Sequence, residues 1–370
     1  MTNDKNKIRE KLTQAFLKTN FQWHSREFLQ TPEGKNELEE HLFRRFDHCS
    51  EYTIPWVQSY YDLRGKTVLE IGCGSGSISA AMAGAADHVF GFDIHEASID
   101  AARARVKVLD INNVEFILSR PGEVVADVAK LAARQKVHAV MLHALLEHQT
   151  IAERIETLKL AWDIIDDEGI VIISESPNRI SFYDDHTSHL HFFHMLPDDL
   201  ALRYYTRSPR LGFRNDIEAG LSISTEEAIL RLTRFGRGVS YHEFELAFGG
   251  IGDHIVLDGY EPEILQLRGG LTEEEIFLYR YFRKQSLDIP ASFSKRYLDF
   301  VLCKKKVDKH RKQQRLEEIE SIVLNLQNDE MLRVKRELAQ LTLSLSWRMT
   351  SPLRWVKFRL KKAAAAFRAR

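Results

Sequence analysis

The sequence lacks the features that mark exported proteins, membrane-spanning proteins and proteins stabilised by disulfides or structural metal ions. Its 370 residues include only three cysteines, Cys49, Cys73 and Cys303, which lie far apart and form no CxxC or CxxH pair. This spacing excludes a disulfide framework and a zinc-finger pattern. The first residues carry charges where a signal peptide needs an apolar core, and no run of about 18 apolar residues follows. We therefore expect a cytoplasmic protein.

Acidic and basic residues nearly cancel, but they are unevenly distributed. The formal net charge is −1, while residues 348–370 contain eight Lys or Arg residues and no acid, which leaves −9 for the rest of the chain. A net charge of −9 on residues 1–347 argues against nonspecific nucleic-acid binding by that part of the chain. The composition, with 44% hydrophobic and 28% charged residues, is that of an ordinary globular protein. The length predicts two or three structural units of about 100–200 residues.

Strand-like and helix-like segments alternate between Lys66 and Ser176. The strand-like segments are short apolar runs at 67–74, 88–94, 114–118, 137–145 and 169–176. The helix-like segments are 75–86, 96–109, 123–135 and 151–165. Strands that alternate with helices of about 10–15 residues are typical of a parallel sheet covered on both faces. We therefore predict an α/β, doubly wound fold.

The segments on either side of this pattern complete the predicted domain. Residues 1–64 are expected to form a helical extension that serves as a substrate lid. Two further strand-like segments, 239–248 and 296–305, are expected to pair antiparallel at the sheet edge. A helical insert at about residues 250–290 would then shape a substrate pocket, and the domain would span residues 65–305.

Residues 306–346 contain neither glycine nor proline. Their apolar residues recur at spacings of three and four with one skip: Leu316, Ile319, Val323, Leu326, Met331, Val334, Leu338, Leu341 and Leu345. This heptad-like seam predicts a short coiled coil that would join copies of the chain in a homo-oligomer. The alternative is a single helix that packs on the domain. Residues 347–370 are predicted to form a basic amphipathic tail.

The segment VLEIGCGSG, at residues 68–76, carries the clearest chemical signal. Glycines at Gly72, Gly74 and Gly76, in the turn after a buried strand, let the backbone approach a bound ligand closely. A dinucleotide fingerprint would place its third glycine where Ser77 stands. The carboxylate of Glu70 would repel a pyrophosphate but attract the ammonium group of an amino-acid ligand.

A second acid, Asp93, follows the glycine turn at the end of the next strand. A carboxylate at this place can accept hydrogen bonds from both ribose hydroxyls of a nucleoside. The two acids and three glycines therefore describe a pocket for a cationic aminoacyl nucleoside, which identifies S-adenosylmethionine as the expected cofactor. The candidate cofactor-binding residues are Glu70, Gly72, Gly74, Gly76, Asp93, Ile94, Ser119, Arg120 and His143.

The order VLEIGCGSG, FGFDI, VEFIL, VHAVMLHALLEH and GIVIISESPNR resembles class I S-adenosylmethionine-dependent methyltransferases over about residues 66–305. It is most similar to the branch of ubiquinone-biosynthesis-type and sugar-type enzymes. The motifs that carry this similarity are LEH at 146–148, Pro177-Asn178 and HLHFF at 189–193. The resemblance implies a Rossmann-like sheet of seven strands and the activity of a methyltransferase.

The sequence departs from the family pattern where the adenine is held. The family usually has an Asp near the end of the third strand, and Arg120 stands there in this chain. We therefore expect backbone groups of residues 119–122 to hold the adenine amine. The Asp common at the start of the fourth strand is replaced by His138.

Methyl transfer to a hydroxyl requires a base, and histidine suits neutral pH. His148, His189 and His191 are the catalytic candidates, because they follow the fourth and fifth strands, and ligands bind at the carboxyl ends of such strands. In an extended segment His189 and His191 would point the same way. For each of the three, a structural or substrate-orienting role is the alternative.

The segment DDHTSHLHFFH, at residues 184–194, allows two further interpretations. Asp184 and Asp185, with several imidazoles, could instead hold a divalent metal, but the segment has no fixed ligand spacing and we expect no metal. The aromatic residues Phe182, Tyr183 and 192–193 could stack on a sugar ring or close a core.

A second resemblance concerns the segment SLSWRMTSPLR at residues 344–354. It is similar to a tail found after coiled coils in bacterial enzymes that build surface polysaccharides such as O-antigen, which favours a sugar hydroxyl as the acceptor. The basic tail would bind an anionic membrane at its inner face or a polysaccharide assembly enzyme. We therefore predict an O-methyltransferase for a surface polysaccharide or a lipid-linked glycan. The alternatives are a quinone or aromatic O-methyltransferase and a non-catalytic scaffold.

Overall fold

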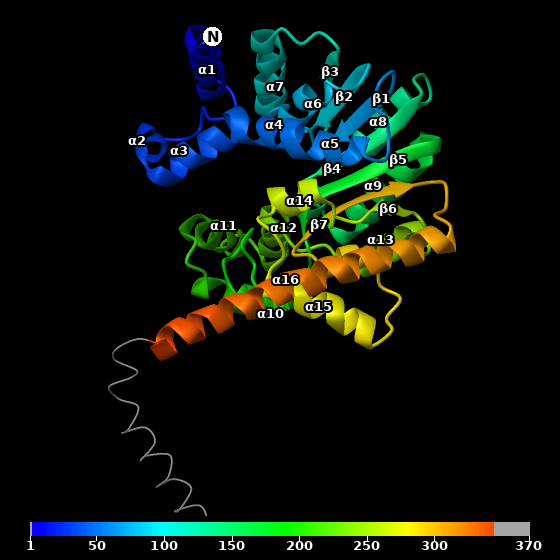
Figure 1. The fold of residues 1–370 in the computed structure, drawn as a ribbon. Coiled ribbons are helices and arrows are strands. Elements are labelled where there is room, and N and C mark those ends of the chain that lie inside the picture. Colours follow the sequence, from blue (N-terminus) through cyan, green and yellow to red (C-terminus); the bar gives the residue numbers. More distant parts are fainter. Residues whose placement is uncertain (1, 344–370) are drawn as a thin grey trace, which may run out of the picture. The chain divides into compact units, whose positions relative to one another are not determined.

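A computed structural model describes residues 2–343 of the chain, with side chains between residues 6 and 326. The chain divides into two units, Met1–Val307 and Asp308–Arg370. The first unit contains a seven-stranded sheet with the order β3-β2-β1-β4-β5-β7-β6 (Figure 1). The strands are β1 Thr67–Ile71, β2 His88–Asp93, β3 Val114–Leu118, β4 Val137–His143, β5 Ile165–Pro177, β6 Ile255–Leu257 and β7 Tyr297–Cys303.

Strands β1 to β5 are parallel, and β7 pairs antiparallel with both β5 and β6. The sheet order reverses between β1 and β4, because the chain first runs outward to β3 and then returns to the other side of β1. In open α/β sheets ligands bind at the carboxyl ends of the strands beside such a reversal. The predicted doubly wound, Rossmann-like fold is confirmed, and its topology locates the site.

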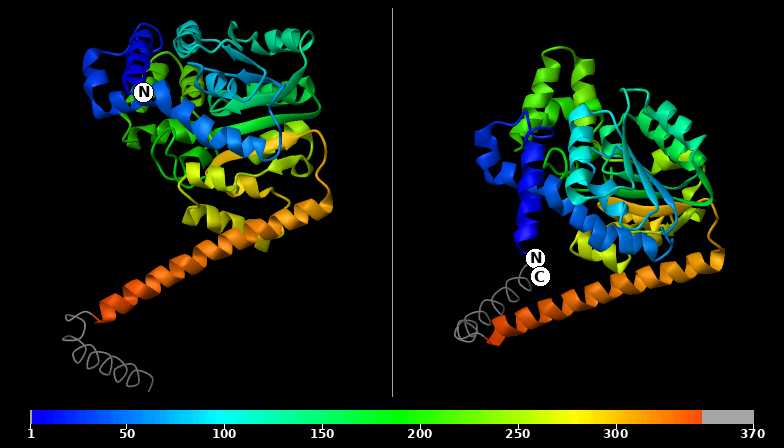
Figure 2. Two further views of the ribbon diagram at one scale, coloured as in Figure 1. Left: turned by 45° about the horizontal axis from the view of Figure 1, so that its top comes forward. Right: turned by 90° about the horizontal axis from the view of Figure 1, so that it is seen from above.

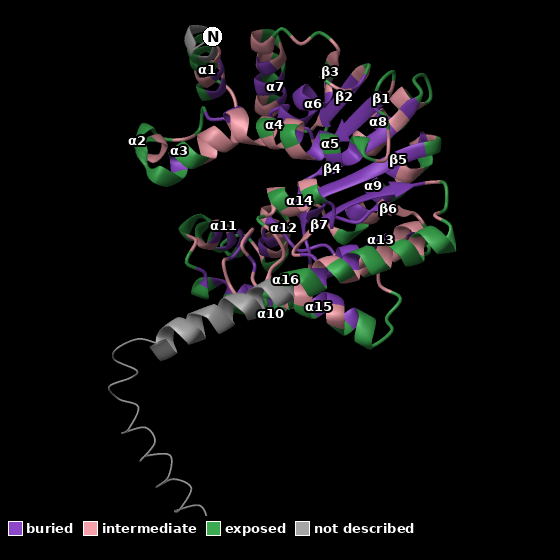
Figure 3. Cartoon of the chain, viewed as in Figure 1, coloured by how far each residue is buried: buried purple, intermediate pink, exposed green. Residues whose placement is uncertain are grey.

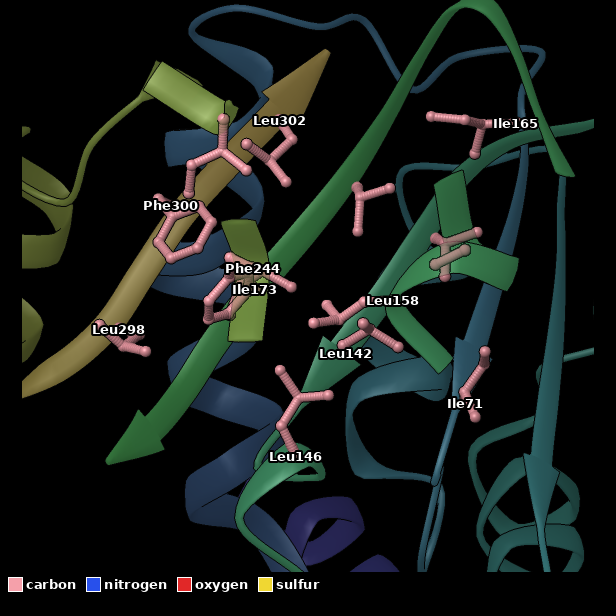
Figure 4. Packing of buried hydrophobic residues seen from close by; sticks show 14 of the residues in the cluster. Ile71, Leu142, Leu146, Leu158, Ile165, Ile173, Phe244, Leu298, Phe300 and Leu302 are labelled. Carbon is pink, nitrogen blue, oxygen red and sulfur yellow. The ribbon is translucent and has the colours of Figure 1, made fainter. Parts of the chain in front are cut away.

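Two apolar layers cover the two faces of the sheet, because successive side chains of a strand point to opposite sides. On β4, Val140 and Leu142 belong to one core cluster, and Ala139 and Met141 belong to the other. Figure 4 shows the first cluster, in which Phe244 lies beside Ile173 of β5 and near Phe300 of β7. Strand β1 is buried along its whole length and β4 along all but one residue (Figure 3), as expected for a parallel sheet with both faces covered.

The connecting helices agree with the predicted alternation. They are α6 Ser77–Met82, α7 Glu96–Leu109, α8 Val124–Ala132 and α9 Ile151–Ile164. Helix α9 begins at a capping box in which the Thr150 side chain accepts from the Glu153 N–H and the Glu153 carboxylate accepts from the Thr150 N–H.

Residues 2–58 are mainly helical, as predicted. They comprise α1 Thr2–Leu17, α2 Arg26–Gln30, α3 Pro32–Glu39, α4 Arg45–His48 and α5 Ile54–Gln58, with π-helical turns at Glu40–Arg44 and Cys49–Thr53. Helix α1 packs against α7 (Figure 2). The buried guanidinium of Arg105, on α7, donates to the carbonyl groups of His41, Leu42 and Ser75. This side chain therefore fixes the N-terminal helices to the glycine turn.

The prediction of a strand over residues 239–248 is wrong, because the segment forms helix α13, Tyr241–Phe248. A capping box between Ser240 and Glu243 starts the helix. Phe244 and Phe248 are four residues apart and pack inward, whereas Leu246 is 67% exposed. An alternation of Phe, Leu and Phe thus resembled a strand although only one helical face is buried.

The antiparallel edge of the sheet exists, but β6 supplies it. This strand lies inside the segment at 250–290 that was expected to be a helical insert. The insert forms a short 3-10 helix, Ile251–Asp253, before β6, and its α-helices follow β6: α14 Pro262–Leu267 and α15 Glu273–Lys284. A further helical group lies between β5 and α13 and has its own apolar cluster. Its helices are α10 Asp198–Tyr204, α11 Leu211–Leu221 and α12 Thr225–Phe235.

The second unit contains one long helix, α16, Lys309–Leu343. It covers most of residues 306–346, where a coiled coil is predicted, and pairing with a second chain stays a prediction. The predicted tail at 347–370 and the polysaccharide-enzyme motif at 344–354 lie outside the described residues. None of the helices between residues 2 and 343 combines the length and the apolar composition that crossing a bilayer demands.

Candidate functional site

The glycine turn after β1 requires glycine at two of its three positions for packing reasons. Gly72, Gly74 and Gly76 all have positive φ angles, of 77°, 50° and 71°. A Cβ atom on Gly72 would lie 2.6 Å from the side chain of Leu145, and one on Gly76 would lie 2.7 Å from that of Ala102. At Gly74 a Cβ would meet no atom within 4 Å. The backbone at Gly74 is therefore open to a ligand.

Asp93, at the end of β2, holds this turn directly. Its Oδ2 accepts from the N–H of Gly74 at 2.7 Å, and its Oδ1 accepts from the N–H of His95 at 2.9 Å. Each carboxylate oxygen has a second lone pair, so both can still accept from ribose hydroxyls. The structure thus brings the second acid and the glycine turn together, as predicted.

Glu70 is buried under the turn, and its carboxylate accepts a hydrogen bond from the Ser79 hydroxyl. Burial raises the pKa of Glu70 to about 8, and the hydrogen bond from Ser79 opposes this shift. Among residues 6–326 no salt bridge reaches this carboxylate. A buried acid without a cation is the partner that the ammonium of an aminoacyl nucleoside needs.

Three other predicted cofactor-binding residues, Ile94, Ser119 and Arg120, differ in their exposure and in their contact with Asp93. Ile94 follows it and is exposed, while the backbone N–H of Ser119 donates to the Asp93 carbonyl at 2.9 Å. The side chain of Arg120 is 84% exposed and pairs with Glu123 at 3.9 Å. The Arg120 side chain therefore points to solvent, and contact between the backbone of residues 119–122 and an adenine stays a prediction.

His143, the last residue of β4, lies beside the glycine turn because β4 pairs with β1. Its side chain is buried, and its Nε2 lies 3.3 Å from Oε2 of Glu175, on β5. Burial lowers the pKa of His143, while the Glu175 carboxylate opposes the shift. The lowered pKa favours the neutral imidazole of His143.

The three predicted catalytic histidines do not meet. His148 ends a 3-10 turn, Leu146–His148, and approaches His186 with ring centroids 5.5 Å apart. His189 has a φ of 56°, so its segment is not extended, and the condition under which His189 and His191 would point the same way is not met. The ring of His191 packs on Tyr183 instead, with centroids 5.0 Å apart.

Glu147, His148 and His186 form a cluster that the sequence analysis did not assemble. One ligand atom from each of them lies within 4.8 Å of the others. The Nδ1 of His148 lies 2.8 Å from the Arg234 carbonyl, and the Nδ1 of His186 lies 3.1 Å from the Thr187 hydroxyl. These contacts leave the Nε2 atoms free toward Glu147, whose buried Oε1 has no hydrogen-bond partner. The cluster could hold a divalent transition metal.

The two acids considered for a metal are engaged elsewhere. Asp184 accepts from the backbone N–H groups of Thr187 and Ser188 and lies 3.1 Å from the buried His194 ring. Asp185 accepts from Arg296 and from a tyrosine hydroxyl. Both carboxylates therefore shape the loop after β5. Only a signal from the tertiary structure could show that Glu147 and His186 lie together.

The aromatic residues near this loop divide between core and surface. Phe193 is fully buried in the cluster formed by helices α10 to α12. Phe192 is 50% exposed and packs on Phe182, which also contacts the exposed Phe277 of α15. Phe277 in turn stacks on Tyr281. The surface therefore carries a row of aromatic rings close to the carboxyl end of β5.

Residues 62–196 match the protein family described as "Methyltransferase domain". The chain is 33% identical over 108 residues to a ubiquinone biosynthesis O-methyltransferase from Paraburkholderia phytofirmans, which covers 29% of this chain and 43% of the relative. A protein of the same description from Neisseria meningitidis is 27% identical over 134 residues, which cover 36% and 53%. The chain thus spans about half the length of the curated relatives it matches.

Among solved structures, magnesium protoporphyrin IX methyltransferase from Synechocystis PCC 6803 with bound S-adenosylhomocysteine matches with a TM-score of 0.36 and 19% identity, covering 61% of this chain and 80% of that chain. Residues 62–196 of the first unit thus match a methyltransferase-domain family, and the seven-stranded sheet to which they contribute has a Rossmann-like order.

Proposed function

We propose that this protein transfers a methyl group from S-adenosylmethionine to a sugar hydroxyl of a bacterial surface polysaccharide or a lipid-linked glycan. The observation that carries the proposal is the arrangement of Glu70, the open backbone at Gly74 and Asp93 at the carboxyl ends of β1 and β2. These groups suit the ammonium, the backbone contact and the ribose of the donor.

The donor's sulfonium already activates the methyl group, so the domain must align the acceptor oxygen, the methyl carbon and the sulfur. Such positioning is worth about 7–11 kcal/mol. A hydroxyl acceptor also loses its proton during attack, and a placed base contributes roughly 10²–10⁴-fold. The histidines at the carboxyl ends of β4 and β5 are in the right region of the fold for this task.

Two observations support a glycan as the acceptor. The exposed rings of Phe192, Phe277 and Tyr281, joined by the half-buried Phe182, offer flat apolar faces against which sugar rings can pack. The motif at 344–354 resembles tails of surface-polysaccharide enzymes. The predicted coiled coil and basic tail would then place the enzyme at the inner face of the membrane as an oligomer.

A second candidate is an O-methyltransferase for a quinone or a small aromatic acceptor. The curated relatives with this description favour it. A third candidate is a scaffold that keeps the fold without catalysis, which the intact pair of Glu70 and Asp93 argues against. Mass spectrometry separates these candidates, because only the first predicts a 14-dalton difference in a surface glycan between cells with and without the protein.

Titration calorimetry with S-adenosylhomocysteine tests the donor site. We expect saturable binding to the full chain and its loss in Asp93→Ala, because this substitution removes both the ribose acceptor and the brace of the glycine turn. Absence of binding to the wild-type chain would contradict the proposed activity. If cells that carry Asp93→Ala make the same surface glycan as cells with the wild-type protein, the protein acts without binding the donor, which would instead support the scaffold.

A further inference from the structure

The ends of β4 and β5 carry a buried histidine–carboxylate pair. His143 lies 3.3 Å from Glu175 through Nε2 and Oε2, and both ring nitrogens of His143 are buried without a hydrogen-bond partner. Catalytic hydrogen bonds are often long before substrate binds and tighten in the complex. The pair lies at the strand ends next to the donor turn, where a reacting hydroxyl must be placed.

Glu175 is held in place by charged groups from two other elements. Its Oε1 accepts from the Arg268 guanidinium at 2.9 Å, and Arg268 also binds Asp299 of β7 at 2.7 Å and 2.9 Å. Asp299 in turn accepts from the backbone N–H of Glu175 and from the Ser174 hydroxyl. This network fixes Glu175 and directs its second oxygen toward His143.

The backbone at this point is strained. Ala144 and Glu175 have φ angles of 46° and 61°, in the left-handed region that residues with a Cβ seldom adopt. The N–H of Ala144 donates to the Ser174 carbonyl at 2.9 Å, which joins the two strained strand ends. Such conformations cost about 1–3 kcal/mol each and gather at functional sites, where the surrounding structure maintains them.

The charges around the pair decide the protonation of its members. The Glu175 carboxylate has its pKa lowered to about 2: burial raises the pKa, and the Arg268 guanidinium is the strongest of the charges that lower it. An anionic Oε2 facing Nε2 stabilises the tautomer with the proton on Nε2, which leaves the Nδ1 lone pair free. Arg45, Arg268 and Asp299 are the other charged groups that act on His143.

We propose that His143 is the general base of the methyl transfer and that Glu175 is its positioning residue. The acceptor hydroxyl gives its proton to Nδ1 of His143 as its oxygen attacks the methyl carbon. The carbon–sulfur bond breaks, its electron pair stays on sulfur, and S-adenosylhomocysteine leaves. The imidazolium, stabilised by Glu175, then releases the proton to water. This inference rests on the proposed function and assigns its base.

His148 fits this task less well. Its Nδ1 is engaged by the Arg234 carbonyl and its Nε2 faces Glu147, so its ring belongs to the cluster with His186. His189 and His191 lie on the loop after β5 and are not at a strand end. Only His143 combines a place beside the glycine turn with a carboxylate that fixes its tautomer.

The test uses the full chain, methyl-labelled S-adenosylmethionine and surface polysaccharide extracted from cells that lack the protein. We expect His143→Gln to lower kcat by about 10²–10⁴-fold, whereas a role of His143 in cofactor binding alone would raise the Kd for S-adenosylhomocysteine and leave kcat near the wild-type value. His242→Gln, on the exposed start of α13, is the matched control and should retain the wild-type rate. Activity of His143→Gln near that of the control would overturn the inference alone.

Glu175→Gln provides an independent measurement. In ¹⁵N-labelled protein with S-adenosylhomocysteine, the nitrogen shifts of His143 should show a proton on Nε2, and the substitution should shift the ring toward the other tautomer. An unchanged tautomer would overturn the role of Glu175. If the wild-type chain binds no S-adenosylhomocysteine and transfers no label, the proposed function fails and the assignment of a base falls with it.

Discussion

The buried carboxylate of Glu70 should make the free protein less stable as the pH rises. Its pKa in the folded chain is about 8 against an ordinary value of 4.5, and the cause is burial. The folded state therefore holds a proton that the unfolded state releases, and this contribution to stability is lost between about pH 4.5 and pH 8. At 1.36 kcal/mol per pKa unit, the loss reaches at most about 5 kcal/mol, of which about 2 kcal/mol falls between pH 6 and pH 8.

The substitution Glu70→Gln isolates this contribution, because glutamine has nearly the same shape and can still accept from the Ser79 hydroxyl. Urea unfolding of the wild type and the variant at pH 6 and pH 8 measures it. We expect the free energy of unfolding of the wild type to fall by about 2 kcal/mol more than that of the variant. Parallel pH dependences of the two proteins would refute the reasoning.

The same residue should couple donor binding to pH in the opposite sense. The ammonium of S-adenosylhomocysteine needs the charged carboxylate, so its affinity should rise between pH 6 and pH 8. Loss of a hydrogen bond to a charged group costs about 1.5–3 kcal/mol, so Glu70→Gln should weaken binding roughly 10- to 150-fold. 5′-Methylthioadenosine lacks the ammonium and serves as the matched ligand. Equal losses for the two ligands would show that Glu70 acts only through the fold.

Three further predictions concern other parts of the chain. Arg268→Met should lower the free energy of unfolding by about 3–5 kcal/mol, because it leaves Asp299 buried without its cation, whereas Arg64→Met at an exposed ion pair should cause no measurable change in urea titrations. Titration calorimetry with Mn²⁺ should show binding to the wild type at the cluster of Glu147, His148 and His186, and the substitution Glu147→Gln should abolish this binding. Equal binding to the wild type and the variant would place the ion at another site. Deletion of residues 348–370 should release the chain from anionic vesicles at low salt with donor binding unchanged, and unaltered vesicle association would contradict a membrane role for the tail.

Local patterns were sufficient to predict the framework of the donor site. The alternation of buried strands and helices between Lys66 and Ser176 is a property of short segments, because each strand or helix shows its own period along the chain. Glu70, the glycine turn and Asp93 lie next to strand ends, and parallel strands bring their carboxyl ends to one edge. Their meeting therefore follows from the topology that the sequence predicts.

The predictions failed in short segments whose apolar or histidine spacing fits a strand but also fits a helix or a loop. Phe244, Leu246 and Phe248 alternate like a strand, but a capping box and the packing of Phe244 in the core select a helix. The period-two expectation for His189 and His191 failed because His189 adopts a left-handed conformation in a tight loop. In both cases a tertiary contact or a turn determined the local conformation.

The sequence by itself determined the sheet, its glycine turn and the two acids, since these depend on neighbours along the chain. Only the tertiary structure decided which groups surround the acceptor side. It joins His143 to Glu175 across two strands, and it places Arg268 and Asp299, more than 90 residues beyond Glu175, against that carboxylate. The physical reason is that charge, burial and tautomer are set by atoms within a few ångströms, whatever their separation in the chain.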